Sequence, residues 1–184
     1  TRLFVGSVRC VQETAGKRVF PHVTQMQELH NGEIWMTTTG QGMFRLDEEQ
    51  KQAVSVDELL RQSNYNFQSC FYEDSYYNLW IGTYGNGLIC YIPATKEVRV
   101  FKYTALNDNN IAAIIEDKQG NLFVGTQKKG LSCYNRKENC FTPVPYMGNN
   151  VLSVYCMSLV DGQLLVGTDG QGLKKYNPIK MCLE

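Results

Sequence analysis

The stretch that decides the fold is Glu116-Asp117-Lys118-Gln119-Gly120-Asn121-Leu122-Phe123-Val124-Gly125-Thr126, followed by Gly130-Leu131. Its polar half is predicted to be a turn, because glycine and asparagine tolerate the left-handed backbone conformation that tight turns need. Its apolar half, 122–126, is predicted to be a strand whose two faces are both apolar, since successive side chains point to opposite sides. Such a strand must be covered on both sides.

The same pattern recurs along the chain. It appears as Ile34–Thr38, Leu79–Thr83 and Leu164–Thr168, with equivalent positions at 37, 82, 125 and 167, so the steps are 45, 43 and 42 residues. A degenerate fifth copy begins at Leu3-Phe4-Val5-Gly6-Ser7. A period of about 40–45 residues with strand-like content is typical of the blades of a β-propeller.

The sequence therefore predicts an all-β fold, a β-propeller with four full four-stranded blades plus a partial blade. The expected limits are 1–22 for the partial blade and 23–63, 64–106, 107–148 and 149–184 for the full ones. In the third repeat the expected strands are 111–116, 122–126, 131–135 and 140–144, the last an outer edge strand because it carries prolines. A short helical turn is expected at 56–62.

Two recurring positions on the second strand explain how such blades would pack. An aromatic or leucine position recurs as Phe4, Trp35, Trp80, Phe123 and Leu165, and these side chains are expected to pack between blades. The glycine that follows suits the crowding where blades converge. A two-sheet sandwich would instead alternate apolar and polar residues along each strand.

Composition excludes several classes of partner. Lysine plus arginine is 18 and aspartate plus glutamate is 18, so the net charge is 0. Binding to nucleic acid or to an anionic membrane depends on a basic excess, so neither is expected. The longest apolar run, 111–115, is far shorter than the ~20 residues of a membrane helix, so this segment is expected to make no membrane contact.

The seven cysteines indicate neither a zinc site nor a fully paired disulfide framework, because their number is odd and no C-x-x-C pair occurs. No metal or other cofactor is expected. Most are predicted to be small apolar fillers. Cys133 and Cys140 flank a short turn, which leaves a disulfide across a hairpin open as an alternative.

The third repeat resembles the regulator-propeller repeat of hybrid two-component system sensors, large sensor proteins typical of gut Bacteroidetes. The residues that carry this resemblance are Glu116-Asp117, Gly120–Thr126 and Gly130-Leu131. The second repeat matches through Glu73-Asp74 and 78–83, followed by Gly87-Leu88. The fourth lacks the Glu-Asp pair, and the first has Thr37 in place of the expected glycine.

The resemblance implies a periplasmic sensor region of tandem propellers, followed by an immunoglobulin-like module, a membrane helix, a histidine kinase and a response regulator. Such sensors typically recognise oligosaccharides from polysaccharide breakdown. None of the kinase signatures occurs in this sequence, so the chain is expected to belong to the sensing region and not to be an enzyme. Seven blades are implied, so the chain is expected to be a fragment that begins inside a blade and ends soon after a third strand.

Ligand-binding candidates lie in the loops between second and third strands and in the connections between blades. Amides both donate and accept hydrogen bonds and aromatic rings stack on sugars, so these residue types suit a neutral glycan. The alternative is that asparagines fill these loops because they form local turns. The candidates are Tyr65, Tyr84, Asn86, Asn109, Gln127, Lys128, Asp169 and Gln171.

The recurring Glu73-Asp74 and Glu116-Asp117 pairs are interpreted as turn caps. They precede equivalent turns in different blades and so cannot converge on one substrate atom, as a glycosidase pair must. His22 and His30 are the only histidines, and neither has an obvious catalytic partner in the sequence. No catalytic residue is therefore assigned, although a propeller lyase stays open as a third reading.

A protein-interaction scaffold is the second reading, because propellers bind polypeptides through the same face. An aromatic-lined pocket would favour the sensor, and a flat apolar patch would favour the scaffold. The expected partners are an oligosaccharide and the remainder of the sensor propeller, and a homodimer is a further way to cover open blades. In the expected mechanism, a ligand that prefers one arrangement of propeller surfaces shifts them and passes the change to a kinase outside this chain.

Overall fold

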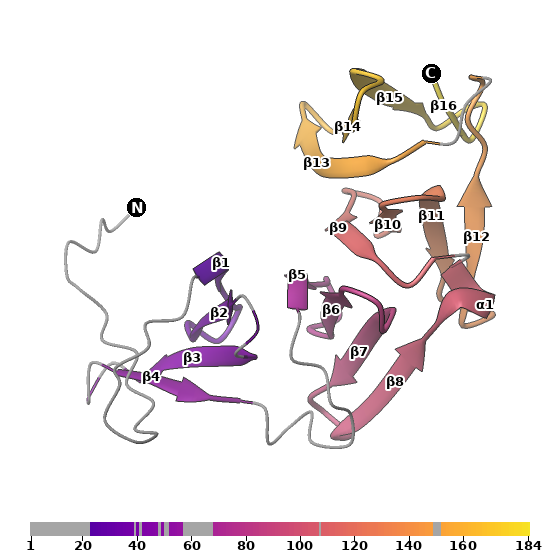
Figure 1. The fold of residues 1–184 in the computed structure, drawn as a ribbon. Helices are drawn as coiled ribbons and strands as arrows, with labels where there is room; N and C mark the ends of the chain where they lie inside the picture. Colours follow the sequence, from indigo (N-terminus) through magenta and orange to yellow (C-terminus); the bar gives the residue numbers. More distant parts are fainter. Residues whose placement is uncertain are drawn as a thin grey trace. The chain divides into compact units, whose positions relative to one another are not determined.

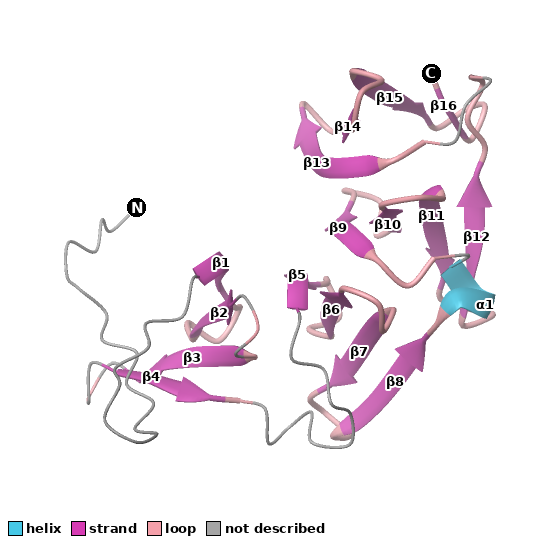
Figure 2. Cartoon of the chain, in the orientation of Figure 1, coloured by secondary structure: helices cyan, strands magenta, loops and turns pink. Residues whose placement is uncertain are grey.

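A computed structural model describes residues 23–38, 40, 42–47, 49, 52–56, 68–106, 108–148 and 152–184. The chain divides into two compact units, 1–67 and 68–184, and each is described by itself. The described part consists of antiparallel strands with one short helix, α1, at Tyr103–Leu106 (Figure 2). The all-β prediction is confirmed.

The first unit contains one four-stranded sheet of order β1-β2-β3-β4. Its strands are β1 (Val23–Glu28), β2 (Ile34–Thr38), β3 (Met43–Asp47) and β4 (Gln52–Ser55). The second strand is buried from Trp35 to Thr38, and the Trp35 indole donates to Glu33 Oε2 at 3.0 Å. The partial blade predicted for 1–22 and most of the helical turn predicted at 56–62 lie outside the described residues.

The second unit contains three further sheets, each with its four strands in sequence order. The first has β5 (Gln68–Glu73), β6 (Leu79–Thr83), β7 (Leu88–Ile92) and β8 (Glu97–Phe101). The second has β9 (Ile111–Glu116), β10 (Leu122–Thr126), β11 (Gly130–Asn135) and β12 (Cys140–Val144). The third has β13 (Val154–Val160), β14 (Gln163–Thr168), β15 (Leu173–Asn177) and β16 (Cys182–Leu183).

These three sheets are blades that stand side by side, called here blade A (β5–β8), blade B (β9–β12) and blade C (β13–β16) (Figure 1). The first strands of consecutive blades, β5, β9 and β13, lie next to one another. Adjacent blades therefore pack on each other through their first and second strands, as the doubly apolar second strand predicts.

Burial of the second strand confirms that prediction. All five residues of β6 and all five of β10 are buried, and Leu122, Phe123 and Val124 have no exposed surface. Leu122 and Val124 belong to the core shared with blade A, whereas Phe123 belongs to the core shared with blade C. Successive residues of one strand thus fill two different inter-blade cores.

The recurring glycine lets the first strand of the next blade approach. A Cβ placed on Gly82 would lie 2.7 Å from Ile111 Cγ2 of blade B, and one placed on Gly125 would overlap Val154 of blade C. Both distances are shorter than van der Waals contact, so a side chain at either position would push adjacent blades apart. The predicted reason for these glycines is confirmed.

One strand prediction needs correction. The last repeat does not end after its third strand, because Cys182–Leu183 forms β16 and pairs with Tyr176 and Asn177 of β15. The Asn177 side chain makes this return possible by accepting the N–H groups of Ile179 and Lys180 at 3.1 Å each. Helix α1, in the connection from blade A to blade B, has no counterpart among the predictions.

The alternative of a disulfide between Cys133 and Cys140 is not realised, since both are free thiols. The register explains why. Cys133 lies opposite Thr142, whereas Cys140 lies opposite Asn135, so the two cysteines share a face but are two ladder positions apart, which is too far for a disulfide.

Candidate functional site

The predicted ligand face is organised by the connection from blade A to blade B. The carbonyl of Asn109 accepts the N–H groups of Gly85 and Gly87 at 3.1 and 2.9 Å, which ties the connection to the β6–β7 loop. On its other side Asp108 Oδ2 accepts the Lys128 N–H at 2.9 Å, and the Asn110 carbonyl accepts that of Gln127 at 3.1 Å. These hydrogen bonds fix two loops on one connection.

These hydrogen bonds bring together the segments that carry five of the eight predicted ligand residues: Tyr84, Asn86, Asn109, Gln127 and Lys128. Asp169 and Gln171 belong to the β14–β15 loop of blade C, where the Asp169 N–H bonds to the Ser153 carbonyl at 2.9 Å. Tyr65 lies outside the described residues.

Two side chains on this face have capacity for a ligand. Tyr84 is 51% exposed, although large aromatic side chains are usually buried. The side-chain oxygen of Asn109 is buried, and among the described residues it has no hydrogen-bond partner. A buried acceptor without a partner is uncommon in proteins, and a bound molecule is one way to satisfy it.

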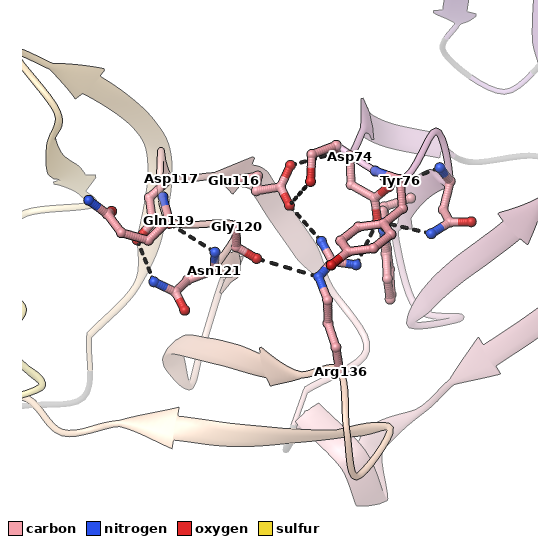
Figure 3. A network of polar contacts seen from close by, with 11 residues as sticks. Asp74, Tyr76, Glu116, Asp117, Gln119, Gly120, Asn121 and Arg136 are labelled. Carbon is pink, nitrogen blue, oxygen red and sulfur yellow. Dashed lines mark hydrogen bonds and ion pairs between the residues drawn. The ribbon is translucent and has the colours of Figure 1, made fainter.

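The Glu-Asp pairs lie at the opposite ends of the strands, and Figure 3 shows Asp74, Glu116 and Asp117 there. Asp74 and Asp117 cap their turns as predicted. Asp74 Oδ1 accepts the N–H groups of Tyr76 and Asn78, both at 2.9 Å, and Asp117 Oδ1 accepts those of Gln119 and Asn121 at 2.9 and 2.8 Å.

The prediction that Glu116 also caps a turn is wrong. Its carboxylate crosses to blade A, where it accepts the Ser75 N–H at 2.6 Å and the Ser75 hydroxyl at 2.9 Å. The Arg136 guanidinium lies between the two blades and donates to Glu116 Oε1 at 2.6 Å and to Asp74 Oδ2 at 2.9 Å (Figure 3). We call this group of Asp74, Ser75, Glu116 and Arg136 the clamp.

The two carboxylates of the clamp are buried, so water screens their attraction to Arg136 only weakly. The Asp74 side chain has no exposed surface and that of Glu116 is 6% exposed, while Arg136 stacks 4.5 Å from the centre of the Tyr76 ring. Burial opposes ionisation of Asp74, but hydrogen bonds from Trp80, Asn78 and Arg136 outweigh it and hold its pKa below the usual value. Burial likewise opposes the charge of Arg136, yet its two carboxylate partners raise its pKa.

The sequence offered no signal for Arg136, because only this copy of the turn after the third strand carries an arginine. Its position becomes meaningful only when blade packing brings Asp74, 62 residues away in the chain, within hydrogen-bonding distance. The carboxylates of the clamp are used for blade packing, and the arrangement does not resemble an acid–base pair around an open substrate site.

Other residues weighed for catalysis or binding offer no constellation. His30 lies exposed in the β1–β2 turn, and His22 is outside the described residues. Within the described ranges, no group of three or more histidine, cysteine, aspartate or glutamate residues could hold a metal ion. No helix in the described part has the length and apolar character needed to cross a membrane.

Consecutive antiparallel four-stranded blades, packed first strand to first strand, define a segment of a β-propeller. Residues 61–85 and 105–128 match the family model of the two component regulator propeller. This confirms the resemblance expected from the sequence. No curated protein has a detectable match to the chain.

Solved structures share the fold. The extracellular domain of the hybrid two-component system BT3049 of B. thetaiotaomicron is 20% identical, with a TM-score of 0.73 over 88% of this chain and 21% of its own. That of the one-component system BT4673 from the same organism is 20% identical, with a TM-score of 0.73 over 94% and 23%. PorZ of the type-IX secretion system of Porphyromonas gingivalis is 14% identical, with a TM-score of 0.66 over 98% and 29%. The chain thus spans less than a third of each of these structures.

Proposed function

We propose that this chain is a ligand-sensing segment of the periplasmic propeller region of a hybrid two-component sensor. The match of two of its repeats to the two component regulator propeller carries this proposal. The fold likeness to extracellular domains of such systems supports an extracytoplasmic location. The kinase that would read the signal lies outside these residues.

The proposed ligand is a neutral oligosaccharide bound at the β6–β7 and β10–β11 loops and the connection between blades A and B. Tyr84 offers an exposed ring for stacking on a sugar, and Asn109 offers a buried amide oxygen that would accept a hydroxyl. Asn86, Gln127 and Lys128 belong to the loops held by the same connection and offer further donors. A ligand that bridges this face and another propeller surface would favour one arrangement of the two, and this preference would be the signal.

The remainder of the propeller is the proposed partner of blade C. The outer face of this blade repeats the packing surface of blade B: Gly167 takes the place of Gly125, Leu165 that of Phe123 and Leu173 that of Leu131. Leu131 is buried under blade C, whereas Leu173 is 66% exposed. This face has the shape and apolar character that a further blade would cover.

Calorimetric titration of the chain with a panel of neutral oligosaccharides tests the proposed site. Binding of one member, weakened about fivefold or more by Tyr84→Ala and by Asn109→Ala, is the expected result. The Asn109 substitution leaves the loop intact, because the hydrogen bonds from Gly85 and Gly87 go to the main-chain carbonyl of residue 109. Gln119→Ala, in a turn at the opposite strand ends, is the matched control. An unresponsive panel, or binding that ignores both substitutions, would overturn the proposal.

A further inference from the structure

A groove of about 1120 Å³ lies between blades B and C, at the strand ends that carry the capped turns. Its lining includes Asp117, Asn121, Cys133, Asp161, Gln163 and Tyr176. None of the seven predicted ligand residues that the structure describes lines it, because those residues lie at the other ends of the strands. The groove is therefore independent of the proposed oligosaccharide site.

The corresponding space between blades A and B is filled. Four aromatic rings occupy it, with Trp80 4.8 Å from Tyr134 and Phe101 5.2 Å from Phe141 between ring centres. The strand registers identify the equivalent residues between blades B and C, and three of the four are smaller. They are Phe123 for Trp80, Val144 for Phe101, Tyr176 for Tyr134 and Leu183 for Phe141.

The arginine of the clamp has no counterpart between blades B and C. Arg136 directly follows Asn135 in the turn of blade B, and the equivalent residue after Asn177 in blade C is Pro178. The arginine that closes the space between blades A and B is thus missing from the next interface. Pro178 lines the groove instead.

One of the two carboxylates that would receive this arginine is kept, whereas Leu159 takes the place of Glu116. Asp117 caps its turn with the same bonds as Asp74, including one from the amide of the residue four positions on: Asn121 at 2.8 Å and Asn78 at 3.2 Å, respectively. Asp74 Oδ2 also accepts the Trp80 indole at 2.7 Å and Arg136 at 2.9 Å. Among the described residues, Asp117 Oδ2 accepts only the Asn121 amide, since Phe123 and Pro178 have no side-chain donor.

We propose that this groove binds the guanidinium of an arginine carried by a partner polypeptide, with Asp117 Oδ2 as its acceptor. The neighbouring interface supplies the template, because there the equivalent carboxylate holds an arginine in a seat between two blades. Asp161, exposed on the other wall, adds a second negative charge. Three cations also line the groove. Lys180 is paired with Glu184 at 2.8 Å and Arg136 with Asp74 and Glu116, which reduces their opposition to a bound cation, whereas Lys137 adds a positive charge.

The groove favours arginine over lysine. A guanidinium is planar, donates in a fixed fork and stacks on aromatic rings, whereas an ammonium is a compact and strongly hydrated charge. The floor offers the ring of Tyr176, which packs edge-on against Phe123 at 4.9 Å between ring centres. The clamp shows the same combination, since Arg136 meets both a carboxylate and the Tyr76 ring.

Amide-resolved NMR titration with N-acetyl-L-argininamide tests the proposal, and the citrulline analogue is the neutral probe of the same shape. The expected result is that the arginine probe shifts the amide signals of Gln119 and Asn121, and that the citrulline analogue does so at least about tenfold more weakly. Asp117→Asn keeps the turn-capping oxygen but removes the charge, and it is expected to weaken the arginine response by a similar factor. Equal responses to both probes, or an arginine response that Asp117→Asn leaves unchanged, would overturn the proposal.

A second variant places an arginine of the chain itself in the groove beside Asp117. Pro178→Arg restores the arginine at its equivalent position, so the chain's own side chain is expected to compete with the probe and weaken its binding. Its thermal midpoint is also expected to rise. Probe binding of undiminished strength in this variant, with the blade folded as judged by its NMR spectrum, would contradict the assignment of the seat.

Discussion

Gly125 on β10 meets Val154 on β13 with no room for another atom. A Cβ on Gly125 would lie 3.0 Å from Val154 Cβ and 3.3 Å from Val154 Cγ2, and closer still to its other methyl. This contact joins blade B to blade C, and Gly82 with Ile111 joins blade A to blade B in the same way. The recurring glycine is therefore a packing requirement of consecutive blades.

Gly125→Ala is expected to lower the free energy of unfolding by about 1–3 kcal/mol, because the added methyl overpacks a close contact. Urea denaturation measures the loss. Val154→Ala creates the missing space, so the double variant should be less destabilised than the two single losses added together. Simple additivity would show that the cost arises elsewhere.

Arg136→Met is expected to cost about 2–3 kcal/mol, since it leaves the buried carboxylates of Asp74 and Glu116 without their shared cation. The methionine keeps much of the aliphatic volume, so the loss reports on charge and hydrogen bonding. Chemical denaturation at pH 7 measures it. A variant as stable as the wild type would mean that the clamp contributes nothing to blade packing.

The free energy of unfolding is also expected to depend on pH through the clamp. The pKa of Asp74 is lowered in the folded chain, so its stabilising contribution is present above the unfolded value of about 3.9 and is lost as pH falls through the folded value. Stability should therefore decline more steeply below about pH 4 in the wild type than in Arg136→Met. Denaturation curves at a series of pH values test this, and parallel pH profiles would contradict it.

Trp80→Phe gives blade A the residue that blade B has at the equivalent position, Phe123. The expected loss is about 1–2 kcal/mol, because the indole donates to the buried Asp74 carboxylate at 2.7 Å and a phenyl ring cannot. The same substitution in a variant that already carries Asp74→Asn should cost less, since the acceptor is then neutral. Thermal denaturation of the four proteins completes the cycle.

Cys70 and Cys156 occupy equivalent positions, opposite Gly82 and Gly167, but differ in exposure. Burial raises the pKa of Cys70 to about 12, whereas Cys156 lies exposed on the outer face of blade C. Maleimide at neutral pH should therefore label Cys156 quickly and Cys70 only after denaturation, as judged by peptide mass spectrometry. If a second copy covers blade C, labelling of Cys156 should slow as protein concentration rises.

Much of the fold follows from local sequence. The strand 122–126 was predictable because its two apolar faces and the flanking glycine turns are repeated in other blades. The capping roles of Asp74 and Asp117 were predictable for the same reason, since each turn contains both the acid and the amides that it binds.

Interactions between blades were harder to predict. Glu116 stands next to Asp117 in the sequence, yet it bonds to Ser75 at a separation of 41 residues. Arg136 occurs in one copy of its turn only, so no repeat pattern marked it. The groove between blades B and C depends on the simultaneous replacement of Trp80, Phe101, Phe141 and Arg136 at equivalent positions, which becomes visible only when the registers are known.

The most direct test of the proposed sensing role is to map the binding of the tightest oligosaccharide from the panel by amide-resolved NMR. Shifts are expected at residues 84–87 and 108–110, because these segments carry the exposed Tyr84 ring and the Asn109 oxygen and are joined by backbone hydrogen bonds. Shifts confined to residues 117–121 and 161–163, at the other ends of the strands, would contradict the assigned face.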